Sequence, residues 1–402
     1  MNHTLFKKFQ NFRHSLNGAF LDRTDVIDGL LASLIAKQNA FLFGPPGTGK
    51  SELVRAVANG FQGSKYFGYL LSPTTDPSEL YGPVAVSKLL KDEYTRDVKG
   101  YLPDCNVAFL DELFRGSSAV LNSLLQILNE RTFNNGKDAV ETEIQSIVAA
   151  TNSFPSDESL KAFCDRFLFR PTINGLKSPA DKRTLLRWAV AKSPETSRPE
   201  IKSELTYSDL LKLQDDCKNV TVSDNFVDQF SEVLEMLESR GISVSDRRRV
   251  QIIKFMKGWA VVQGEEEVHG NMLHQTLKHI VYTNSDEISD IEEVVKHVVP
   301  KPEELLSSLQ KASRNMMIKF EGERAKLTDQ TLTVSDINEA VNKFIDIRGQ
   351  LTILQQKLEE MLDDKTLRFT AAGRLKATKC LNQLEVYRDK VTSHIARYHG
   401  GQ

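Results

Sequence analysis

The chain has 402 residues, of which 40% are hydrophobic and 26% charged, and its formal net charge is -2. This composition is ordinary for a globular protein of two or three domains, and the small net charge gives no overall attraction to nucleic acid or anionic membranes. The four cysteines, Cys105, Cys164, Cys217 and Cys380, contain no C-x-x-C pair, which argues against a zinc or redox motif. No apolar run approaches the roughly 20 residues of a membrane span, and segment 1–12 is too polar for a secretory signal. We expect a cytoplasmic protein.

The first half of the chain alternates short apolar strands with helical patterns between about residues 20 and 175. This alternation predicts an α/β core, a mostly parallel sheet with helices on both faces. The expected strands are 40–43, 66–71, 106–110 and 144–151. A continuous apolar run such as 107–110 is typical of a central strand that is buried on both faces.

A glycine-rich loop directly follows the first expected strand. Its residues, Gly44, Pro45, Pro46, Gly47, Thr48, Gly49, Lys50 and Ser51, match the motif G-x-x-x-x-G-K-[ST], and a helical pattern follows. In this strand–loop–helix context the glycines let backbone N–H groups converge on phosphate oxygens at a helix N-terminus. Lys50 can reach the β- and γ-phosphates, and the Ser51 hydroxyl can ligate Mg²⁺. The loop therefore predicts ATP binding.

Two later strands end in polar side chains at the edge of the sheet where ligands bind in such folds. Asp111 and Glu112 close the strand 106–110, and Asn152 closes the strand 144–151. Asp111 would help to hold Mg²⁺ beside Ser51, and Glu112 would activate the attacking water. Asn152 could hydrogen-bond both the γ-phosphate and that water, because an amide is both donor and acceptor. These residues predict ATP hydrolysis.

The second half of the chain has helical patterns throughout. We expect three domains: an α/β core at 1–200, an all-α domain at 201–298 and a helical extension at 299–402. The extension contains a strict heptad pattern of apolar residues, which are Ile337, Ala340, Phe344, Ile347, Leu351, Leu354, Leu358 and Met361. A similar pattern covers 377–398, and Leu305, Leu309, Ala312, Met316 and Phe320 indicate a first helix. Short connections favour an antiparallel three-helix bundle over an intermolecular coiled coil.

The ordered motifs at 44–51, 109–112 and 149–152 resemble those of AAA+ ATPases. Further motifs resemble the MoxR family, and within it the RavA-like branch; they lie at 81–83, 100–103, 121–125, 128–133, 165–167 and 244–248. The resemblance implies that the segment 72–103 is the family's insert in the second helix and that 201–298 is its lid. The sequence of this chain differs from the RavA-like branch after Pro300, where the helical pattern leaves no room for the β-rich module of that branch.

The resemblance also implies roles for two arginines. Arg166 matches the arginine finger, which completes the nucleotide site of a neighbouring subunit and so requires a ring, expected to be a hexamer. Arg170 is the alternative candidate for the arginine finger. Arg247 matches sensor 2, which reaches from the lid to the γ-phosphate, and the adjacent Arg248 and Arg249 are alternatives.

As a whole, the resemblance implies a Mg²⁺-dependent ATPase that remodels a protein substrate in the manner of a chaperone, often with a partner that contains a von Willebrand factor A domain. Two alternatives stay open: a motor stimulated by nucleic acid, and a scaffold whose assembly is set by ATP binding. Nucleic acid is the less favoured partner, because acidic residues nearly cancel the basic residues of the insert.

Overall fold

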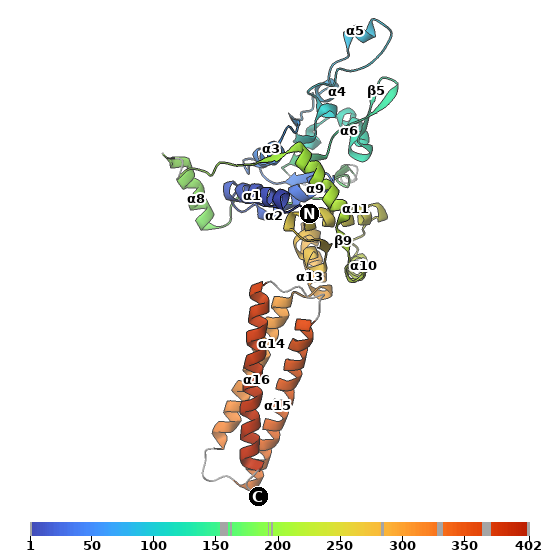
Figure 1. Cartoon of the computed structure of the whole chain (residues 1–402). Helices are drawn as coiled ribbons and strands as arrows, with labels where there is room; N and C mark the ends of the chain where they lie inside the picture. The colour runs from blue at the N-terminus through green and yellow to red at the C-terminus, as the bar shows by residue number, and fades with distance from the viewer. Residues whose placement is uncertain are drawn as a thin grey trace. The chain divides into compact units, whose positions relative to one another are not determined.

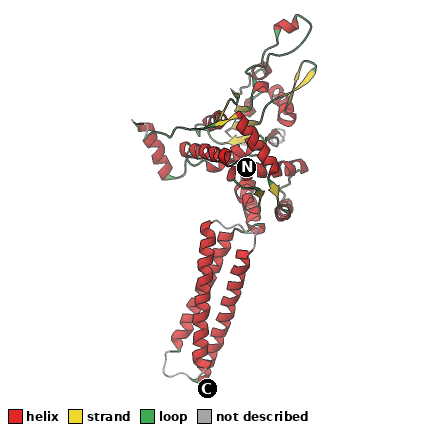
Figure 2. Ribbon diagram, viewed as in Figure 1, coloured by secondary structure: helices red, strands yellow, loops and turns green. Residues whose placement is uncertain are grey.

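A computed structural model describes residues 2–152, 160, 163–191, 193, 196–282, 285–327, 333–363 and 371–399. The chain forms two compact units, Met1–Val294 and Val295–Gln402 (Figure 1). The first unit contains a central sheet and many helices, whereas the regular structure described in the second unit is helical (Figure 2).

The central sheet has four parallel strands in the order β1-β7-β4-β3. Their bounds are Ala40–Phe43 for β1, Tyr66–Leu70 for β3, Val107–Asp111 for β4 and Ser146–Thr151 for β7. All residues of β1 and β7 are buried, as continuous apolar strands in the middle of a parallel sheet must be. The four strands predicted from the sequence are therefore confirmed, with ends that differ by one or two residues.

An extended segment at 169–172 continues the sheet beside β1. The Phe41 N–H donates to the Phe169 carbonyl at 2.8 Å, and the Ile173 N–H donates to the Phe43 carbonyl at 2.6 Å. Single parallel bridges join Ala40 to Phe169 and Phe43 to Thr172. Pro171 has no N–H to donate, so the pairing is interrupted, and the alternation of strands in the sequence did not reveal it.

Helices surround this sheet. In the α/β part they are α1 (His3–Ala19), α2 (Thr24–Ile35), α3 (Lys50–Asn59), α4 (Pro77–Tyr81), α5 (Val86–Leu89), η1 (Leu102–Asp104), η2 (Leu113–Arg115), α6 (Ser118–Glu130) and α8 (Pro179–Val190). One buried apolar cluster joins β1, β4 and β7 to α6, with Phe41, Leu110, Leu124 and Ile147 among its members. The predicted α/β architecture is thereby confirmed.

The predicted insert contains a loop with α5 near its tip. Ala85 donates to the Thr95 carbonyl at 2.8 Å and Asp97 donates to the Pro83 carbonyl at 2.9 Å, so the two arms of the loop run antiparallel. A hairpin of β5 (Thr132–Asn135) and β6 (Asp138–Glu141), which the sequence patterns did not indicate, lies against it. The contact includes a 2.6 Å hydrogen bond from the Arg96 N–H to the Asn135 side chain.

The lid is built mainly from helices: α9 (Tyr207–Asn219), α10 (Asp224–Ser239), α11 (Asp246–Gln263), η3 (Gly270–Met272), α12 (Leu273–Thr276), η4 (Leu277–His279), η5 (Ser285–Glu287) and α13 (Ile288–Val298). Two pairs of two-residue parallel strands involve this region: β9 (Thr221–Val222) pairs with β10 (Glu267–Val268) within it, and β8 (Leu205–Thr206) pairs with β2 (Phe61–Gln62) of the α/β part. These strands are too short to give an alternating sequence pattern, so the region was expected to be wholly helical.

The second unit is a bundle of α14 (Pro302–Lys326), α15 (Val334–Asp363) and α16 (Ala371–His399), which pack around one apolar cluster. The expected stripe on α15 is buried at Ala340, Phe344, Ile347, Leu351 and Leu358. On α14 the buried residues are Pro302, Leu306, Ser313, Met317 and Phe320. Of the predicted stripe, Phe320 is buried in the cluster, and Leu309 and Met316 are partly buried and pack against it. Among the described helices, none has the length and apolar character needed to cross a bilayer.

Candidate functional site

The glycine-rich loop between β1 and α3 has a backbone that only glycine adopts easily. Gly47 and Gly49 have φ values of +79° and +80°, in the left-handed region where side chains are strained. Gly44 has φ +149°, and a Cβ built on it would lie 2.0 Å from the Ile173 carbonyl oxygen. The loop is therefore shaped by its glycines into a turn that leads into the N-terminus of α3, where N–H groups are free to bind an anion.

Lys50, the first residue of α3, has a buried side chain with 7% of its surface exposed. Its Nζ donates to the carbonyl oxygens of Gly44 at 2.5 Å and Pro45 at 3.1 Å. Burial lowers the pKa of Lys50, and the nearby charges of Asp111 and Glu112 oppose this shift. The loop thus holds a cation whose desolvation is only partly compensated and which an anionic ligand would stabilise.

Ser51 and Asp111 come together at the end of β4. The Ser51 Oγ donates to Asp111 Oδ2 at 3.1 Å, which links residues 60 positions apart. A hydroxyl and one carboxylate are the ligands that proteins usually give to Mg²⁺ when phosphate oxygens and water complete the octahedron. In the described part of the chain no group of three or more His, Cys, Asp or Glu side chains could hold a metal alone. The pair therefore fits a metal that arrives with phosphate.

Glu112 is held in a specific position just beyond β4. Its φ of +51° is uncommon for a residue with a side chain and costs conformational free energy, as is typical of functional sites. Its Oε1 accepts a 2.6 Å hydrogen bond from the Asn152 Nδ2, and its Oε2 lies 3.6 Å from the Arg115 Nε. Because β4 and β7 are neighbours in the sheet, residues 40 positions apart meet at the same edge.

A cavity of about 320 Å³ adjoins the glycine-rich loop. Its walls come from the start of α2, the segment after 169–172, and η4; they are Asp22, Arg23, Thr24, Asp25, Val26, Thr172, Ile173, Asn174, Lys177, Lys278 and His279. Ile173 belongs to this wall, and its backbone also lies beside Gly44, so one wall residue of the cavity is a neighbour of the loop. Sequence reasoning missed this cavity, because its residues come from separate segments and form no motif.

The structure separates the two arginines that competed for the finger role. Arg170 is fully buried and donates through Nη2 to the Ile280 carbonyl at 2.8 Å, and burial lowers its pKa to about 9. Such a side chain is part of the core and cannot reach a second subunit. Arg166 is only half-buried and lines a cavity of about 230 Å³ beside α6, together with Asn122, Leu125 and Phe163.

The three arginines at the start of α11 also differ. Arg248 is buried and pairs with Asp165 and with the Ile280 carbonyl. Arg249 pairs with Glu238 across the lid. Arg247 is exposed, and its Nη2 donates to the Asn129 Oδ1 at 3.1 Å. Of the three, Arg247 is the one whose guanidinium is available to a ligand.

Arg166 and Arg247 both lie against helix α6. The residues of α6 that accompany Arg166 in its cavity include Asn122 and Leu125, and Asn129, the partner of Arg247, is one turn further on. Positions 122, 125 and 129 share a helix face because they are three and four residues apart. Within the described residues no hydrogen bond joins either arginine to the group formed by Lys50, Ser51, Asp111, Glu112 and Asn152.

Comparison with known proteins identifies the architecture. A sequence profile described as the MoxR domain of MoxR-vWA-beta-propeller ternary systems matches residues 7–214, and an AAA lid domain profile matches residues 212–295. The chain is 31% identical to an uncharacterized protein of Methanocaldococcus jannaschii over 88% of this chain and 96% of that protein. It is 27% identical to the protein MoxR of Paracoccus denitrificans over 44% of this chain and 53% of that protein.

A solved structure from Cytophaga hutchinsonii, described as a candidate ATPase, has a TM-score of 0.59 to this chain. The match covers 74% of this chain and 94% of that one at 16% identity, which supports the fold alone. The resemblance to the RavA-like branch stays a prediction. Because the MoxR profile covers more than half of the 402 residues and the lid profile continues from it, the chain belongs to the MoxR family of AAA+ ATPases.

Proposed function

We propose that this chain hydrolyses ATP with Mg²⁺ as a ring, and that it uses the energy to remodel a partner protein. The observation that carries the proposal is the paired arrangement at the sheet edge, Ser51 with Asp111 and Glu112 with Asn152, next to the buried Lys50. A phosphate loop alone is compatible with many reactions. A carboxylate that an amide holds in place at the end of a neighbouring strand is an arrangement that can orient and activate a water molecule.

In the proposed mechanism the loop N–H groups bind the β-phosphate, and Lys50 exchanges its carbonyl partners for phosphate oxygens. Ser51 and Asp111 would hold Mg²⁺, which would screen the phosphate charge. Glu112 then orients the attacking water and accepts its proton, while Asn152 positions both the carboxylate and the γ-phosphate. The cavity that includes Arg23 and Ile173 is where we place the nucleoside, because Ile173 on its wall lies beside Gly44.

We further propose that a neighbouring copy completes the site. Arg166 and Arg247 both lie against α6, not within the group at the sheet edge; Arg166 is half-buried and lines the cavity beside α6, and Arg247 is exposed. The simplest role for this pair is to approach the γ-phosphate of the next copy together, as charge stabilisers supplied in trans. A contact of this head-to-tail kind closes into a ring, for which we propose six copies.

The partner we propose is a protein with a von Willebrand factor A domain. The support is the description of the matching profile, which names systems that combine MoxR, vWA and β-propeller proteins. A contact surface for a protein is available on the insert, where Val86, Leu89, Leu90 and Tyr94 are all exposed. Apolar side chains gathered on one projecting loop are typical of a surface that binds another protein.

The test uses variants that separate ATP binding from hydrolysis. Lys50→Ala should lose nucleotide binding, whereas Glu112→Gln should bind ATP and hydrolyse it at least about 100-fold more slowly. ATP-loaded Glu112→Gln would then be used to capture the partner, with Lys50→Ala as the matched control. Recovery of a vWA-domain protein by the first variant alone is the expected result. Turnover by Glu112→Gln at the wild-type rate would contradict the catalytic assignment.

A further inference from the structure

The residue next to Arg166, the proposed arginine finger, is tied to the lid of its own chain. Asp165, which directly precedes Arg166, forms an ion pair with Arg248 in the first turn of α11. The pair joins residues 83 positions apart, and the Arg248 side chain is 5% exposed whereas that of Asp165 is 45% exposed. The Nη2 of Arg248 also donates to the Ile280 carbonyl, so two contacts fix the direction of this guanidinium.

The core fixes the backbone of Arg166 from the other directions. Its N–H donates to the Phe163 carbonyl at 3.1 Å, and its carbonyl accepts from Asn39 Nδ2 at 3.3 Å. The following residue, Phe167, is fully buried and packs edge-on against Phe41 of β1, with 5.1 Å between the ring centres. Of these contacts around Arg166, the one that a movement of the lid would change is therefore the ion pair of the preceding residue.

The Arg166 side chain takes its direction from its backbone and its packing. It is half-buried and lines the cavity beside α6, and its buried Nε has no hydrogen-bond partner among the described residues. A guanidinium at the end of a long side chain moves further than the peptide that carries it when that peptide rotates. A small displacement of Asp165 would therefore become a larger displacement at the guanidinium of Arg166.

The ion pair is a strong link because it compensates buried charge. Arg170 and Arg248 both donate to the Ile280 carbonyl, so two guanidinium groups lie close together in the interior. Burial lowers the pKa of both arginines, and the negative charge of Asp165 opposes the shift in each. Separation of the pair would leave these cations without that carboxylate, which is costly in a buried site. We therefore expect Asp165 to follow Arg248 when the lid moves.

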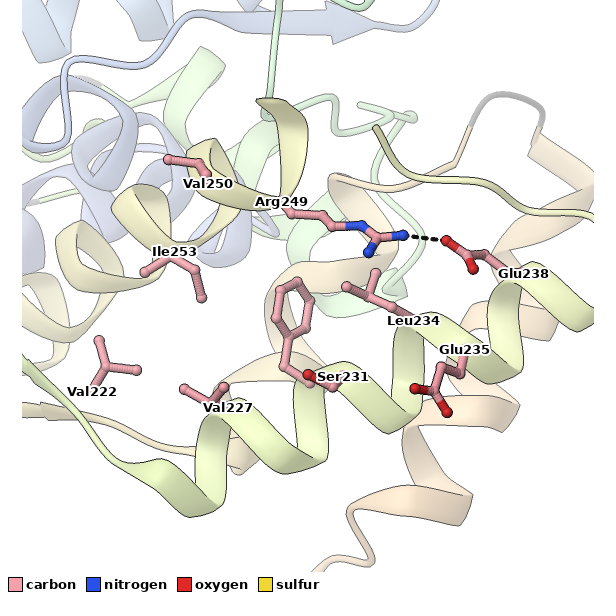
Figure 3. A pocket seen from close by; sticks show the side chains of 10 residues that line it. Val222, Val227, Ser231, Leu234, Glu235, Glu238, Arg249, Val250 and Ile253 are labelled. Atoms are coloured by element: carbon pink, nitrogen blue, oxygen red, sulfur yellow. Dashed lines mark hydrogen bonds and ion pairs between the residues drawn. The ribbon is translucent and has the colours of Figure 1, made fainter. Parts of the chain in front are cut away.

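The next arginine of α11 makes an ion pair that stays within the lid. Arg249 pairs with Glu238 of α10, at the side of an apolar groove between the two helices (Figure 3). Consecutive residues of one helix thus form two kinds of ion pair. The pair of Arg249 joins one lid helix to another, whereas the pair of Arg248 joins the lid to the residue beside Arg166. The first pair is therefore a matched control for the second.

We propose that Asp165 is a positioning residue for Arg166, and that the lid sets this position through Arg248. The inference rests on the proposed function, in which Arg166 acts at the ATP site of the next copy. Rotation of the lid would shift the Asp165 carboxylate, turn the following peptide and change how far the Arg166 guanidinium reaches. The state of one lid would then control the rate at the next site, through contacts that lie within a single chain.

A directional mixing experiment tests the proposal. Lys50→Ala should bind no ATP and can only supply Arg166, whereas Arg166→Ala can only supply an ATP site, and their mixture is the reference. In the donor mixture, Asp165→Asn is added to the Lys50→Ala chain. In the acceptor mixture, Asp165→Asn is added to the Arg166→Ala chain, where no finger is left to position. Both mixtures contain the same substitutions, so a general loss of stability would lower the turnover of both.

We expect the donor mixture to hydrolyse ATP at least about tenfold more slowly than the reference, because misplacement of a charge-stabilising group by about 1 Å is costly in rate. The acceptor mixture should stay within about twofold of the reference. Glu238→Gln, which breaks the ion pair inside the lid, replaces Asp165→Asn in the matched control and should leave both mixtures at the reference rate. Asp165→Glu keeps the charge but moves it by one methylene, so it should give the same asymmetry with a smaller loss, even if Asp165→Asn does not fold.

Equal turnover by the donor and acceptor mixtures, for both Asp165 variants, would overturn the proposal. So would a loss confined to the acceptor mixture, because Asp165 would then act on the site of its own copy. The proposed function can fail separately: a reference mixture that regains no turnover, in assemblies shown to contain both variants, would contradict completion of the site in trans. Active reference mixtures without the donor–acceptor difference would contradict the role of Asp165 alone.

Discussion

The Asn152 side chain donates from Nδ2 to the Oε1 of Glu112 across 2.6 Å, and this hydrogen bond joins the ends of β7 and β4. It holds a carboxylate whose backbone has φ +51°, in a conformation that needs support from its surroundings. The same amide can donate to a γ-phosphate oxygen in place of the carboxylate. Asn152 therefore connects the arrival of phosphate to the position of the proposed base.

Replacing Asn152 tests this connection. Asn152→Ala should reduce kcat for ATP by about 100-fold, because the carboxylate and the γ-phosphate both lose a fixed donor. ATP affinity should change by less than about threefold, since Lys50 and the loop N–H groups are intact. Steady-state turnover and ATP binding, measured on the same preparation, check both parts. An unchanged kcat would show that the hydrogen bond has a structural role only.

The lid arginines give a second prediction, because neighbouring residues should fail in different ways. Arg248→Ala removes the buried partner of Asp165 and of the Ile280 carbonyl, so it should lower Tm by about 5 °C. Arg247→Ala removes an exposed side chain and should leave Tm within about 2 °C, yet reduce ATP turnover at least about tenfold. Thermal unfolding and turnover of the two variants distinguish these effects. The opposite pattern would transfer the nucleotide role to Arg248.

A third prediction concerns pH. Burial lowers the pKa of His279 to about 4, with Lys278 adding to the shift and Glu292 opposing it. In the unfolded chain the pKa is about 6.5, so between these values the unfolded state binds a proton that the native state does not. The stability that this histidine contributes is present above about pH 6.5 and falls as the pH decreases towards 4. At pH 5 the loss should be about 2 kcal/mol.

The measurement is urea unfolding of the nucleotide-free protein and of His279→Gln at pH 7 and pH 5. Other groups titrate in this range, but they are shared, so the difference between the two proteins isolates His279. We expect the wild type to lose about 2 kcal/mol more than His279→Gln on acidification. Equal losses would mean that His279 can be protonated in the native state.

Features that depend on residues close together in the chain could be predicted from the sequence. The order strand, glycine loop and helix placed the loop correctly, and the apolar runs located β1, β3, β4 and β7. Other features depended on tertiary packing. The segment 169–172 was missed because Pro171 interrupts its pairing, and the cavity that includes Arg23 and Ile173 was missed because its walls come from separate segments.

The roles of the arginines also depended on tertiary packing and could not be assigned from local sequence. From the sequence alone, Arg170 stayed an alternative to Arg166 for the finger role. Arg248 and Arg249 stayed alternatives to Arg247 for the sensor 2 role. Only burial and ion pairing distinguish them, and neither is encoded in a window of a few residues. On α14 the predicted stripe reaches the contact at Leu309, Met316 and Phe320, whereas the buried Ser313 was missed because a small polar side chain does not mark an apolar stripe.

The central claim is that each ATP site is completed by the next copy, and mixing two inactive variants tests it most directly. Lys50→Ala cannot bind ATP but keeps Arg166, whereas Arg166→Ala binds ATP but cannot complete its neighbour's site. Arg314→Ala, at an exposed site in the helical bundle, replaces Arg166→Ala as the matched control for a surface arginine.

If the sites act independently, an equal mixture should regain about one quarter of the wild-type turnover, since that share of interfaces pairs an intact loop with an intact Arg166. Each variant alone should be nearly inactive. A mixture as inactive as its components, in assemblies shown to contain both variants, would contradict the account. So would wild-type turnover by Arg166→Ala alone.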